Sequence, residues 1–357
     1  MQLKDAANQT QNEDLTDVFN LLVETLKDEE TNLEQFIIRH KGQKLNPCCD
    51  PIFKAMFTDN SPEANKALKS FLSAVLNREV DEVIVEPNEK PIESLSDKES
   101  LFDVCCRFKG EQTFFDVELQ GRNTQSAYDR RAEYYTAHLL NHYTKKGMKW
   151  NEVPKVYQIS VLNFFYTQND KIINWYTMKN DDNQGLSGSM NVIFIEIKKI
   201  IKKLKNRKIT KELINNLTVI EKWCIFFLCK RDERFSALSE LIVKSQEGIM
   251  EAEQVLSRID EEEINWHRQN AYYDRLSHEA TIIYEANEKG MKQGLQQGIQ
   301  QGIQQGIQQG IQQGISQNRI EIAKRMLEDG LPVQKIAEYT NLSVEEIKKL
   351  SIELKLA

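Results

Sequence analysis

The sequence predicts a mixed α/β (α+β) domain followed by a mainly helical C-terminal half. Apolar residues between positions 61 and 166 occur first at helical spacing, then in three short strand-like runs, and then as one more helix and one more strand. Helical spacing dominates again from residue 198 to residue 290. The chain has 357 residues, of which 40% are hydrophobic, so it is long enough for two or three domains with a substantial core.

Local signals define the elements of the first half. Ser61, Pro62 and Glu63 supply a helix N-cap, a first-turn proline and a first-turn acid, and therefore predict that a helix begins here. Short runs rich in Val, Ile, Phe and Tyr predict strands. The predicted strands are residues 81–85, 101–108, 113–119, 155–166 and 191–197, and the predicted helix before the fourth strand is residues 127–143.

The second and third predicted strands form a β-hairpin in which two carboxylates meet. Gly110 and Glu111 suit a two-residue turn of type II′, which needs glycine at its first central position. In that register Asp103 lies directly opposite Glu118, and opposed residues share a face with Cβ atoms roughly 4.5–5.5 Å apart. Gln120 projects from the same face because side chains alternate along a strand.

Two carboxylates this close repel each other unless a cation lies between them. Mg²⁺ or Mn²⁺ suits such a position, because hard divalent cations bind one or two carboxylates together with water and phosphate oxygens. Asp50 is a third candidate ligand, although an Asp followed by Pro is also typical of a helix N-cap. The alternative for the hairpin is a register shifted by one residue, which separates Asp103 from Glu118 and leaves ordinary solvated charges.

These residues resemble the motif of a known family. The spacing Asp-x14-Glu-x-Gln on a hairpin, followed by a helix with paired arginines and tyrosines, is similar to the PD-(D/E)XK nuclease family transposases, also called recombination-promoting nucleases. The resemblance covers residues 45–357 and includes the glutamine-glycine repeat and the final helices. Its residues are Asp103, Glu118, Gln120, Arg130, Arg131, Tyr134 and Tyr135, with Asp50–Phe57 and Lys98–Ser100 upstream.

The resemblance implies a restriction-endonuclease-like core with the order α-β-β-β-α-β, and a DNA endonuclease activity linked to recombination or transposition. Asp103 and Glu118 would hold Mg²⁺ or Mn²⁺ at the catalytic site. Gln120 stands where related nucleases usually have Lys, and its amide could orient water or a phosphate oxygen without supplying a charge. Phe102 replaces the proline of the motif. The rival hypothesis is a catalytically weak DNA-binding or self-assembling scaffold protein.

Arg130 and Arg131 are candidates for phosphate contact, since guanidinium groups bind phosphate in a bidentate manner. Arg131 and Tyr135 are four residues apart and share a helix face, which favours that pair. The alternative is a structural ion pair between an arginine and Asp129 or Glu133.

A second basic group lies between residues 198 and 211, which contain eight basic residues and no acidic one. The chain as a whole has a net charge of −7, which argues against unspecific coating of nucleic acid. Lys202, Lys203 and Lys205 are therefore candidates for local phosphate contact, which would add affinity rather than specificity. The alternative is a solvated helix face opposite an apolar stripe.

Glycine recurs every four residues from Gly290 to Gly314. This period excludes a strand and gives a slowly winding stripe on a helix. Each interior glycine costs a helix roughly 0.8–1 kcal/mol relative to alanine, so an isolated helix is not expected to be stable. Close approach of two helices along the glycine column would compensate, and a homodimer is the expected assembly. The alternative is a flexible linker.

The tail after the repeat predicts two short helices, Val333–Tyr339 and Ser343–Leu350, which resemble the helix-turn-helix tail of the same family. Ser343 and Glu346 have the spacing of a capping box at the start of the second helix. Such a tail either contacts DNA or only packs as a small helical unit.

The predicted organisation has five parts, in a protein of the cytoplasm that binds DNA and no membrane. The chain contains no run of 18 apolar residues and no signal-like N-terminal segment. Its six cysteines lack the spacing of a zinc site and are expected to be reduced and mostly buried. The parts are an acidic leader (1–40), a nuclease-like core (41–200), a helical region (201–289), the repeat (290–317) and the helical tail (318–357).

Overall fold

The computed structural model of the chain divides into two compact units, Met1–Glu279 and Ala280–Ala357. This boundary does not test the finer five-part division, which stays a prediction. No helix within the described residues is both long and apolar enough to cross a lipid bilayer. The described residues are 14–31, 44–86, 103–121, 128–230 and 232–356.

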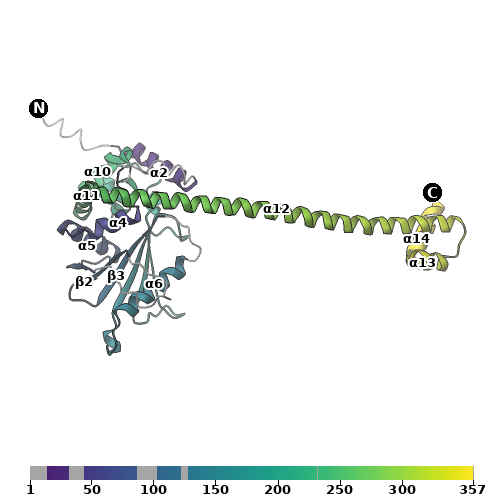
Figure 1. Cartoon of the computed structure of the whole chain (residues 1–357), viewed down its shortest axis with the longest axis horizontal. Helices are drawn as coiled ribbons and strands as arrows, with labels where there is room; N and C mark the ends of the chain where they lie inside the picture. The colour runs from purple at the N-terminus through teal and green to yellow at the C-terminus, as the bar shows by residue number, and fades with distance from the viewer. Residues whose placement is uncertain (1–13, 32–43, 87–102, 122–127, 231, 357) are drawn as a thin grey trace. The chain divides into compact units, whose positions relative to one another are not determined.

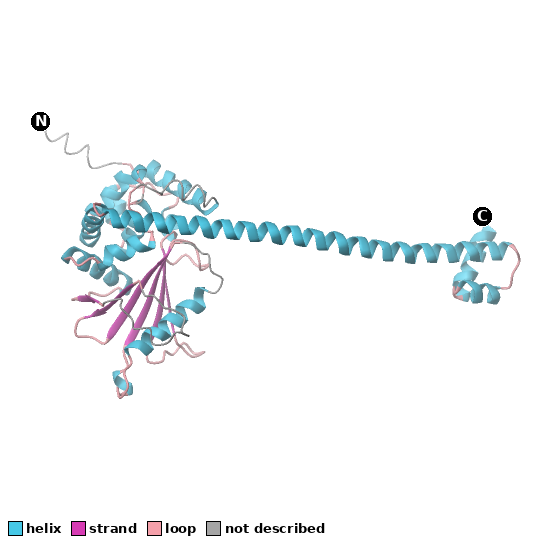
Figure 2. Cartoon of the chain, in the orientation of Figure 1, coloured by secondary structure: helices cyan, strands magenta, loops and turns pink. Residues whose placement is uncertain are grey.

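A six-stranded mixed sheet forms the centre of the first unit (Figures 1 and 2). Its strands are β1 (Val83–Val85), β2 (Val104–Phe108), β3 (Thr113–Gln120), β4 (Lys155–Leu162), β5 (Ile173–Thr177) and β6 (Met190–Glu196). The order across the sheet is β1-β2-β3-β4-β6-β5. The pairs β3–β4 and β4–β6 are parallel and the other pairs are antiparallel.

The predicted α-β-β-β-α-β order is confirmed. It begins with α5 (Pro62–Leu76), continues through β1, β2 and β3, and ends with α6 (Tyr128–Tyr143) and β4. The predicted N-cap of α5 is also correct, because the Ser61 hydroxyl accepts a hydrogen bond from the Ala64 N–H. The prediction missed β5, and the first two residues of the strand predicted over 101–108 lie outside the described residues.

The strand predicted over residues 155–166 is too long. β4 ends at Leu162, because the chain then turns to bind the buried carboxylate at the end of β6. The backbone N–H groups of Tyr166 and Thr167 donate to Glu196 at 2.7 and 3.1 Å. Ladder pairing and this carboxylate cannot use the same N–H groups, so the strand stops before residue 166.

Helices cover both faces of the sheet. On one face α4 (Asp50–Thr58), α5 and α9 (Val219–Cys229) form the main apolar core, in which the rings of Phe71 and Trp223 lie 5.6 Å apart. On the other face lies α6, as Figure 1 shows. Beneath α6 the apolar side chains form two separate clusters, and the sheet residues on that face also include the buried polar Asp116, Glu118 and Ser160.

The remainder of the first unit is mainly helical, as predicted. Its helices are α2 (Thr16–Thr31), α7 (Lys199–Leu204), α8 (Lys211–Asn215), α10 (Ser236–Lys244), α11 (Glu247–Asp260) and the first part of α12 (Glu263–Glu328), with 3₁₀ turns η1 (Trp150–Glu152) and η2 (Glu233–Phe235). Leu22 and Leu26 of α2 are buried in the main core, so this part of the acidic leader packs on the domain. None of the six cysteines forms a disulfide, and all six are buried, as expected.

In the second unit the repeat is helical. Residues 290–314 belong to α12 without a break. The end of α12 packs with α13 (Val333–Thr340) and α14 (Val344–Leu356) around the buried Ala323, Ile336 and Ile347. The predicted capping box is confirmed: the Glu346 N–H donates to Ser343 Oγ at 3.2 Å, and the Ser343 N–H donates to the Glu346 carboxylate at 2.8 Å.

Candidate active site

The β2–β3 hairpin has the predicted register. Val104 pairs with Val117 at the end of the ladder. Asp103 directly precedes β2, so the continuation of this register places it opposite Glu118. The shifted register that would have separated the two carboxylates is therefore excluded.

The turn of the hairpin differs from the predicted one. Four residues, rather than two, connect β2 and β3. The Glu111 N–H donates to the Phe108 carbonyl at 3.3 Å, so that Gly110 is the third residue of the turn, with φ of 78°. Glycine is still required, because this φ lies in the left-handed region, but it occupies a different turn position.

Four carboxylates lie within electrostatic reach of one another. Asp103 is partly buried, and Asp116 lies two residues before Glu118 on the same face of β3. Burial, the nearby carboxylate of Asp50, that of Asp116, a hydrogen bond with Asp50 and the charge of Glu118 together raise the pKa of Asp103 to about 9. Without a bound cation such a cluster destabilises the folded protein, because each carboxylate disfavours the ionisation of the others.

Asp50 is not the N-cap of α4. The N-cap is Cys49, whose side chain makes no capping hydrogen bond, and Asp50 is the first helical residue. The capping interpretation of Asp50 is therefore wrong. Its Oδ1 is buried and has no hydrogen-bond partner among the described residues.

Glu118 is buried and is held by three neighbouring side chains. The Tyr128 hydroxyl donates a hydrogen bond to Glu118 Oε1, and the Ser160 hydroxyl donates another at 3.1 Å. Arg131 Nη2 lies 3.8 Å from the same oxygen. Burial raises the pKa of Glu118, while the guanidinium of Arg131 and the hydrogen bonds from Tyr128 and Ser160 act in the opposite direction. One carboxylate oxygen is thus fixed in position by the protein.

Arg131 and Tyr135 share a face of α6, as predicted. The Arg131 guanidinium lies 4.7 Å from the ring centre of Tyr128 and 5.7 Å from that of Tyr135. Arg130 is exposed on the outer surface of the same helix. The sequence treated both arginines as candidates, whereas the structure places only Arg131 beside the carboxylates.

Gln120 is the last residue of β3, on the same face as Glu118, and is partly exposed. The next residue, Gly121, lies against the first turns of α12: a Cβ at this position would be 2.6 Å from the Tyr272 hydroxyl. The guanidinium of Arg275 lies 5.6 Å from the ring centre of Tyr272. The edge of the site next to Gln120 is therefore formed by a helix more than 140 residues away in the sequence.

Several residues of the site were not predicted from the sequence. Asp116 could have been found, because it lies two positions before Glu118 and strand alternation places it on the same face. Ser160 could not, because its position depends on the parallel pairing of β3 with β4, in which it lies beside Glu118. No local signal indicates Tyr128, Tyr272 or Arg275.

The basic run of residues 198–211 is largely paired within the protein. Lys199 is buried and lies 2.8 Å from Glu196, Lys202 lies 3.8 Å from Asp170, and Lys203 forms an ion pair with Glu221. Of the three lysines considered for DNA contact, only Lys205 lacks an ion pair among the described residues. The apolar side of α7 is buried, so the run fits a partly neutralised helix surface better than a phosphate-binding face.

The carboxylates fit a divalent cation by their chemistry. No group of three or more His, Cys, Asp or Glu side chains within the described ranges is already arranged as a metal cage. The cluster nevertheless contains Asp50 Oδ1, a buried oxygen without a hydrogen-bond partner among the described residues, and Asp103, whose pKa is raised by burial and by three carboxylates. Hard oxygen ligands of this kind suit Mg²⁺ or Mn²⁺.

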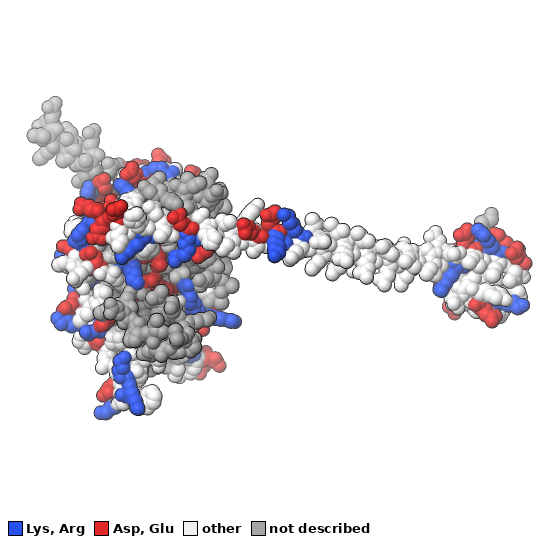
Figure 3. Space-filling model, viewed as in Figure 1, with Lys and Arg blue, Asp and Glu red and all other residues white. Residues whose placement is uncertain are grey.

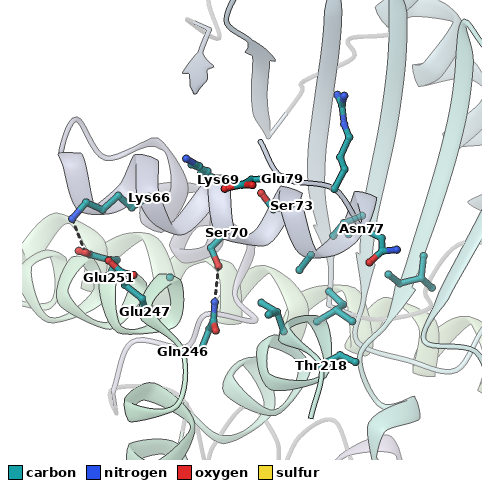
Figure 4. Close-up of a pocket in the computed structure, with 17 residues that line it drawn as sticks. Lys66, Lys69, Ser70, Ser73, Asn77, Glu79, Thr218, Gln246, Glu247 and Glu251 are labelled. Atoms are coloured by element: carbon teal, nitrogen blue, oxygen red, sulfur yellow. Dashed lines mark hydrogen bonds and ion pairs between the residues drawn. The ribbon is translucent and has the colours of Figure 1, made fainter. Parts of the chain in front are cut away.

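A cavity of about 1110 Å³ lies elsewhere, between α5, α11 and the start of α9 (Figure 4). Its charged residues include an ion pair between α5 and α11, in which Lys66 Nζ lies 2.8 Å from Glu251. Gln246, the residue directly before α11, donates a hydrogen bond to Ser70 of α5 at 3.4 Å. The cavity contains none of the four clustered carboxylates and is not the candidate active site.

The mixed sheet, with one acid directly before its second strand and an opposed acid on its third, defines a nuclease-like α/β domain, here followed by a small three-helix unit. The chain belongs to the PD-(D/E)XK nuclease family transposases, whose family model matches residues 47–284. A second model, the C-terminal HTH domain of the Rpn/YhgA-like nuclease family, matches residues 316–352. No curated protein and no solved structure matches the chain.

Proposed function

We propose that the protein is a DNA endonuclease that depends on Mg²⁺ or Mn²⁺ and acts in recombination or transposition. The observation that carries this proposal is the register of the β2–β3 hairpin, which puts Asp103 opposite Glu118. Membership of a nuclease family and the C-terminal helix-turn-helix domain support it. Asp103 and Glu118 would hold the cation, with Asp50 as a third ligand.

A bound divalent cation would lower the pKa of a water molecule and polarise the scissile phosphate. The protein's own residues position the reacting groups. Tyr128 and Ser160 fix one oxygen of Glu118. Gln120 would orient the attacking water or a phosphate oxygen through its amide, and Arg131 would add positive charge beside the phosphate.

DNA as the substrate is supported by the helix-turn-helix domain, in which α14 is in the position of a recognition helix. The first turn of α14 carries Glu345 and Glu346, and acids at that end disfavour contact with phosphates. We therefore assign most of the DNA affinity to the first unit, with the helix-turn-helix domain as an additional weak contact.

The repeat would join two copies of the chain into a homodimer. Ile299, Ile303, Ile307 and Ile311 are each more than half exposed on α12. A Cβ added at any of the repeat glycines would meet nothing within 4 Å, so the glycine column is open. Rows of residues four apart are inclined about 26° to the helix axis, so two such rows interdigitate best when the helices cross at about 50°. A second copy of the same stripe fits this surface because it is self-complementary.

Cleavage of plasmid DNA by the purified full-length protein tests the proposal. We expect conversion of supercoiled plasmid to open or linear forms with Mg²⁺ or Mn²⁺, and no conversion with EDTA. The rival function, a catalytically weak scaffold that binds DNA, predicts a shifted plasmid without broken strands under all three conditions. Binding without cleavage in both metals would therefore favour the rival.

A further inference from the structure

The segment between α6 and β4, residues 144–154, forms a projecting tip at one end of the sheet (Figure 1). Its shape is set by hydrogen bonds. The Met148 N–H donates to the Lys145 carbonyl at 3.1 Å, and Gly147 has φ of 87°, which closes a tight turn. The 3₁₀ turn η1 follows and is capped by Glu152, whose carboxylate accepts from the Lys149 N–H at 3.1 Å. We call this segment the basic tip.

The basic tip holds a tryptophan in solvent. Trp150 is 91% exposed, which is unusual for a side chain that is normally buried over most of its surface. Beside it lies a cavity of about 500 Å³ whose lining also includes Met178 and Leu186, and Leu186 is 73% exposed. An apolar patch of this kind on a structured surface indicates a binding site.

The lysines around Trp150 are not neutralised by the protein. Lys145, Lys146, Lys149 and Lys155 are exposed and have no ion pair with any described residue. Figure 3 shows blue side chains gathered at this tip. The single acid of the segment, Glu152, is already used as a helix cap. Lys202 and Lys203 of α7, in contrast, form ion pairs with acidic residues of the protein. The tip is therefore a locally basic surface in a chain whose net charge is −7.

We propose that the basic tip is a second DNA contact, in which the lysines bind phosphates and Trp150 stacks on an unpaired base. This inference rests on the proposed function and names the form of its substrate. Uncompensated lysines select a polyanion, and an exposed aromatic ring stacks on a base that has left the duplex. The preferred substrate is therefore DNA in which single-stranded nucleotides adjoin a duplex, such as a fork or a hairpin.

The base of the tip lies on the same strand as one of the residues that hold Glu118. Lys155 begins β4, and Ser160, which binds Glu118, lies five residues later on the same strand. A strand rises about 3.3 Å per residue, so the two positions are about 17 Å apart along the sheet. Lys155, at the base of the tip, is therefore about five nucleotide steps of B-form DNA, of about 3.4 Å each, from the strand position that holds Glu118.

Binding measurements without cleavage test this inference. The full-length protein is titrated in EDTA against three fluorescent DNAs, a single strand, a forked duplex and a blunt duplex, over a range of salt concentrations. Trp150→Ala is expected to weaken binding to the single strand and the fork on the order of tenfold, and binding to the blunt duplex less than about twofold. Trp150→Phe, which keeps a ring, should retain most of the affinity.

Lys146→Gln combined with Lys149→Gln serves as the electrostatic variant. It should weaken binding to all three DNAs and reduce the slope of log K against log salt by roughly one to two units. The thermal midpoint and the oligomeric state should be the same as in the wild type for both variants, because the altered side chains are exposed. A dimer that dissociates in Trp150→Ala would assign the tip to protein contact and contradict the inference.

The controls separate this inference from the proposed function. If the wild-type protein binds DNA and Trp150→Ala binds each of the three DNAs as tightly as the wild type does, the stacking role is wrong while the nuclease proposal stands. If the wild-type protein binds none of the three DNAs, the proposed function fails and the role of the basic tip fails with it.

Discussion

The ionisation of Asp103 is strongly disfavoured by its surroundings. Burial and the carboxylates of Asp50, Asp116 and Glu118 raise its pKa to about 9. The unfolded chain releases this proton near pH 4, so between about pH 4 and pH 9 the folded state binds more protons than the unfolded state. The free energy of unfolding is therefore expected to decrease as the pH rises through this window. A cation among the carboxylates would oppose that decrease.

Asp103→Asn is expected to stabilise the protein in the absence of metal. At pH 8 the free energy of unfolding should rise by about 0.5–2 kcal/mol, because the neutral amide removes the repulsion. Part of the pH dependence should disappear with it. Thermal unfolding with and without Mg²⁺ is the measurement: the metal should raise the wild-type midpoint and leave that of the variant unchanged.

Asp181→Asn is the matched control, since Asp181 is exposed and lies outside the carboxylate cluster. It should leave both the midpoint and the response to Mg²⁺ unaltered. An Asp103→Asn protein that is less stable than wild type, or that still gains stability from Mg²⁺, would show that Asp103 is not part of a cation site.

Gln120→Ala should slow cleavage on the order of 10- to 100-fold, because an orienting amide is lost while the carboxylates remain. Gln120→Lys should retain more activity, since lysine supplies a hydrogen-bond donor and a charge at the same position. Single-turnover cleavage rates at saturating protein, together with DNA affinity in EDTA, separate the chemical step from binding. Equal rates for wild type and Gln120→Ala would exclude a role for this amide.

At the scale of single residues, the sequence predicted those that depend on one local pairing. Strand alternation and the position of one glycine were enough to predict that Asp103 lies opposite Glu118, although the turn itself was predicted wrongly. Ser160 and Tyr128 were not predictable in the same way, because they meet Glu118 only after β4 and α6 have packed on β3. Hydrophobic patterns contain no information on which strands become neighbours.

At the scale of elements, the long periodic segments were the most predictable. α5, α6, β3 and β6 follow from apolar spacing and capping residues, within one or two residues at each end. β5 was missed because it is a short edge strand with three exposed residues, and its pattern therefore lacks apolar alternation. The repeat was left open between helix and linker because glycine content and helical period favour opposite states.

Replacing glycines of the repeat by alanine is expected to have opposite effects on helix stability and on dimer association. Gly302→Ala with Gly306→Ala should stabilise the helix of an isolated chain by roughly 1.6–2 kcal/mol, since the added methyl groups meet nothing within 4 Å. In a dimer with close backbone contact along this column, the same methyl groups should weaken association. We therefore expect circular dichroism of a dilute sample to show more helix, and analytical ultracentrifugation to show a larger dissociation constant.

Gln300→Ala with Gln304→Ala is the control for this experiment, because it changes another column of the same helix. It should affect the dissociation constant much less. Tighter association of the glycine variants would indicate that helix stability alone limits assembly and that the glycines are not a contact surface.

At the scale of the whole molecule, an acidic protein is proposed to act on an acidic polymer. The net charge of −7 disfavours encounter with DNA, so binding must depend on local features such as Arg131 and the basic tip. Each subunit has one proposed catalytic centre, and one such centre cuts one strand. The dimer through the repeat would therefore provide the two centres that a double-strand break requires.

Deletion of residues 290–317 should convert the dimer into a monomer and double-strand cutting into nicking. Light scattering reports the mass in solution, and plasmid cleavage distinguishes linear from open-circular products. The cleavage rate per centre should remain within a few-fold of wild type, because the proposed catalytic residues lie in the first unit. A dimer that persists after the deletion, or a monomeric wild-type chain, would return the repeat to the role of a spacer.

The most direct measurement of the central claim is the rate of plasmid cleavage by Asp103→Asn and Glu118→Gln in Mg²⁺, alongside their affinity for DNA in EDTA. Both variants should lose activity on the order of 100-fold or more while binding DNA as tightly as wild type, because each substitution removes a proposed cation ligand and leaves the proposed DNA-contacting surface intact. Cleavage by both variants at the wild-type rate would contradict the assignment of the hairpin carboxylates as the catalytic centre.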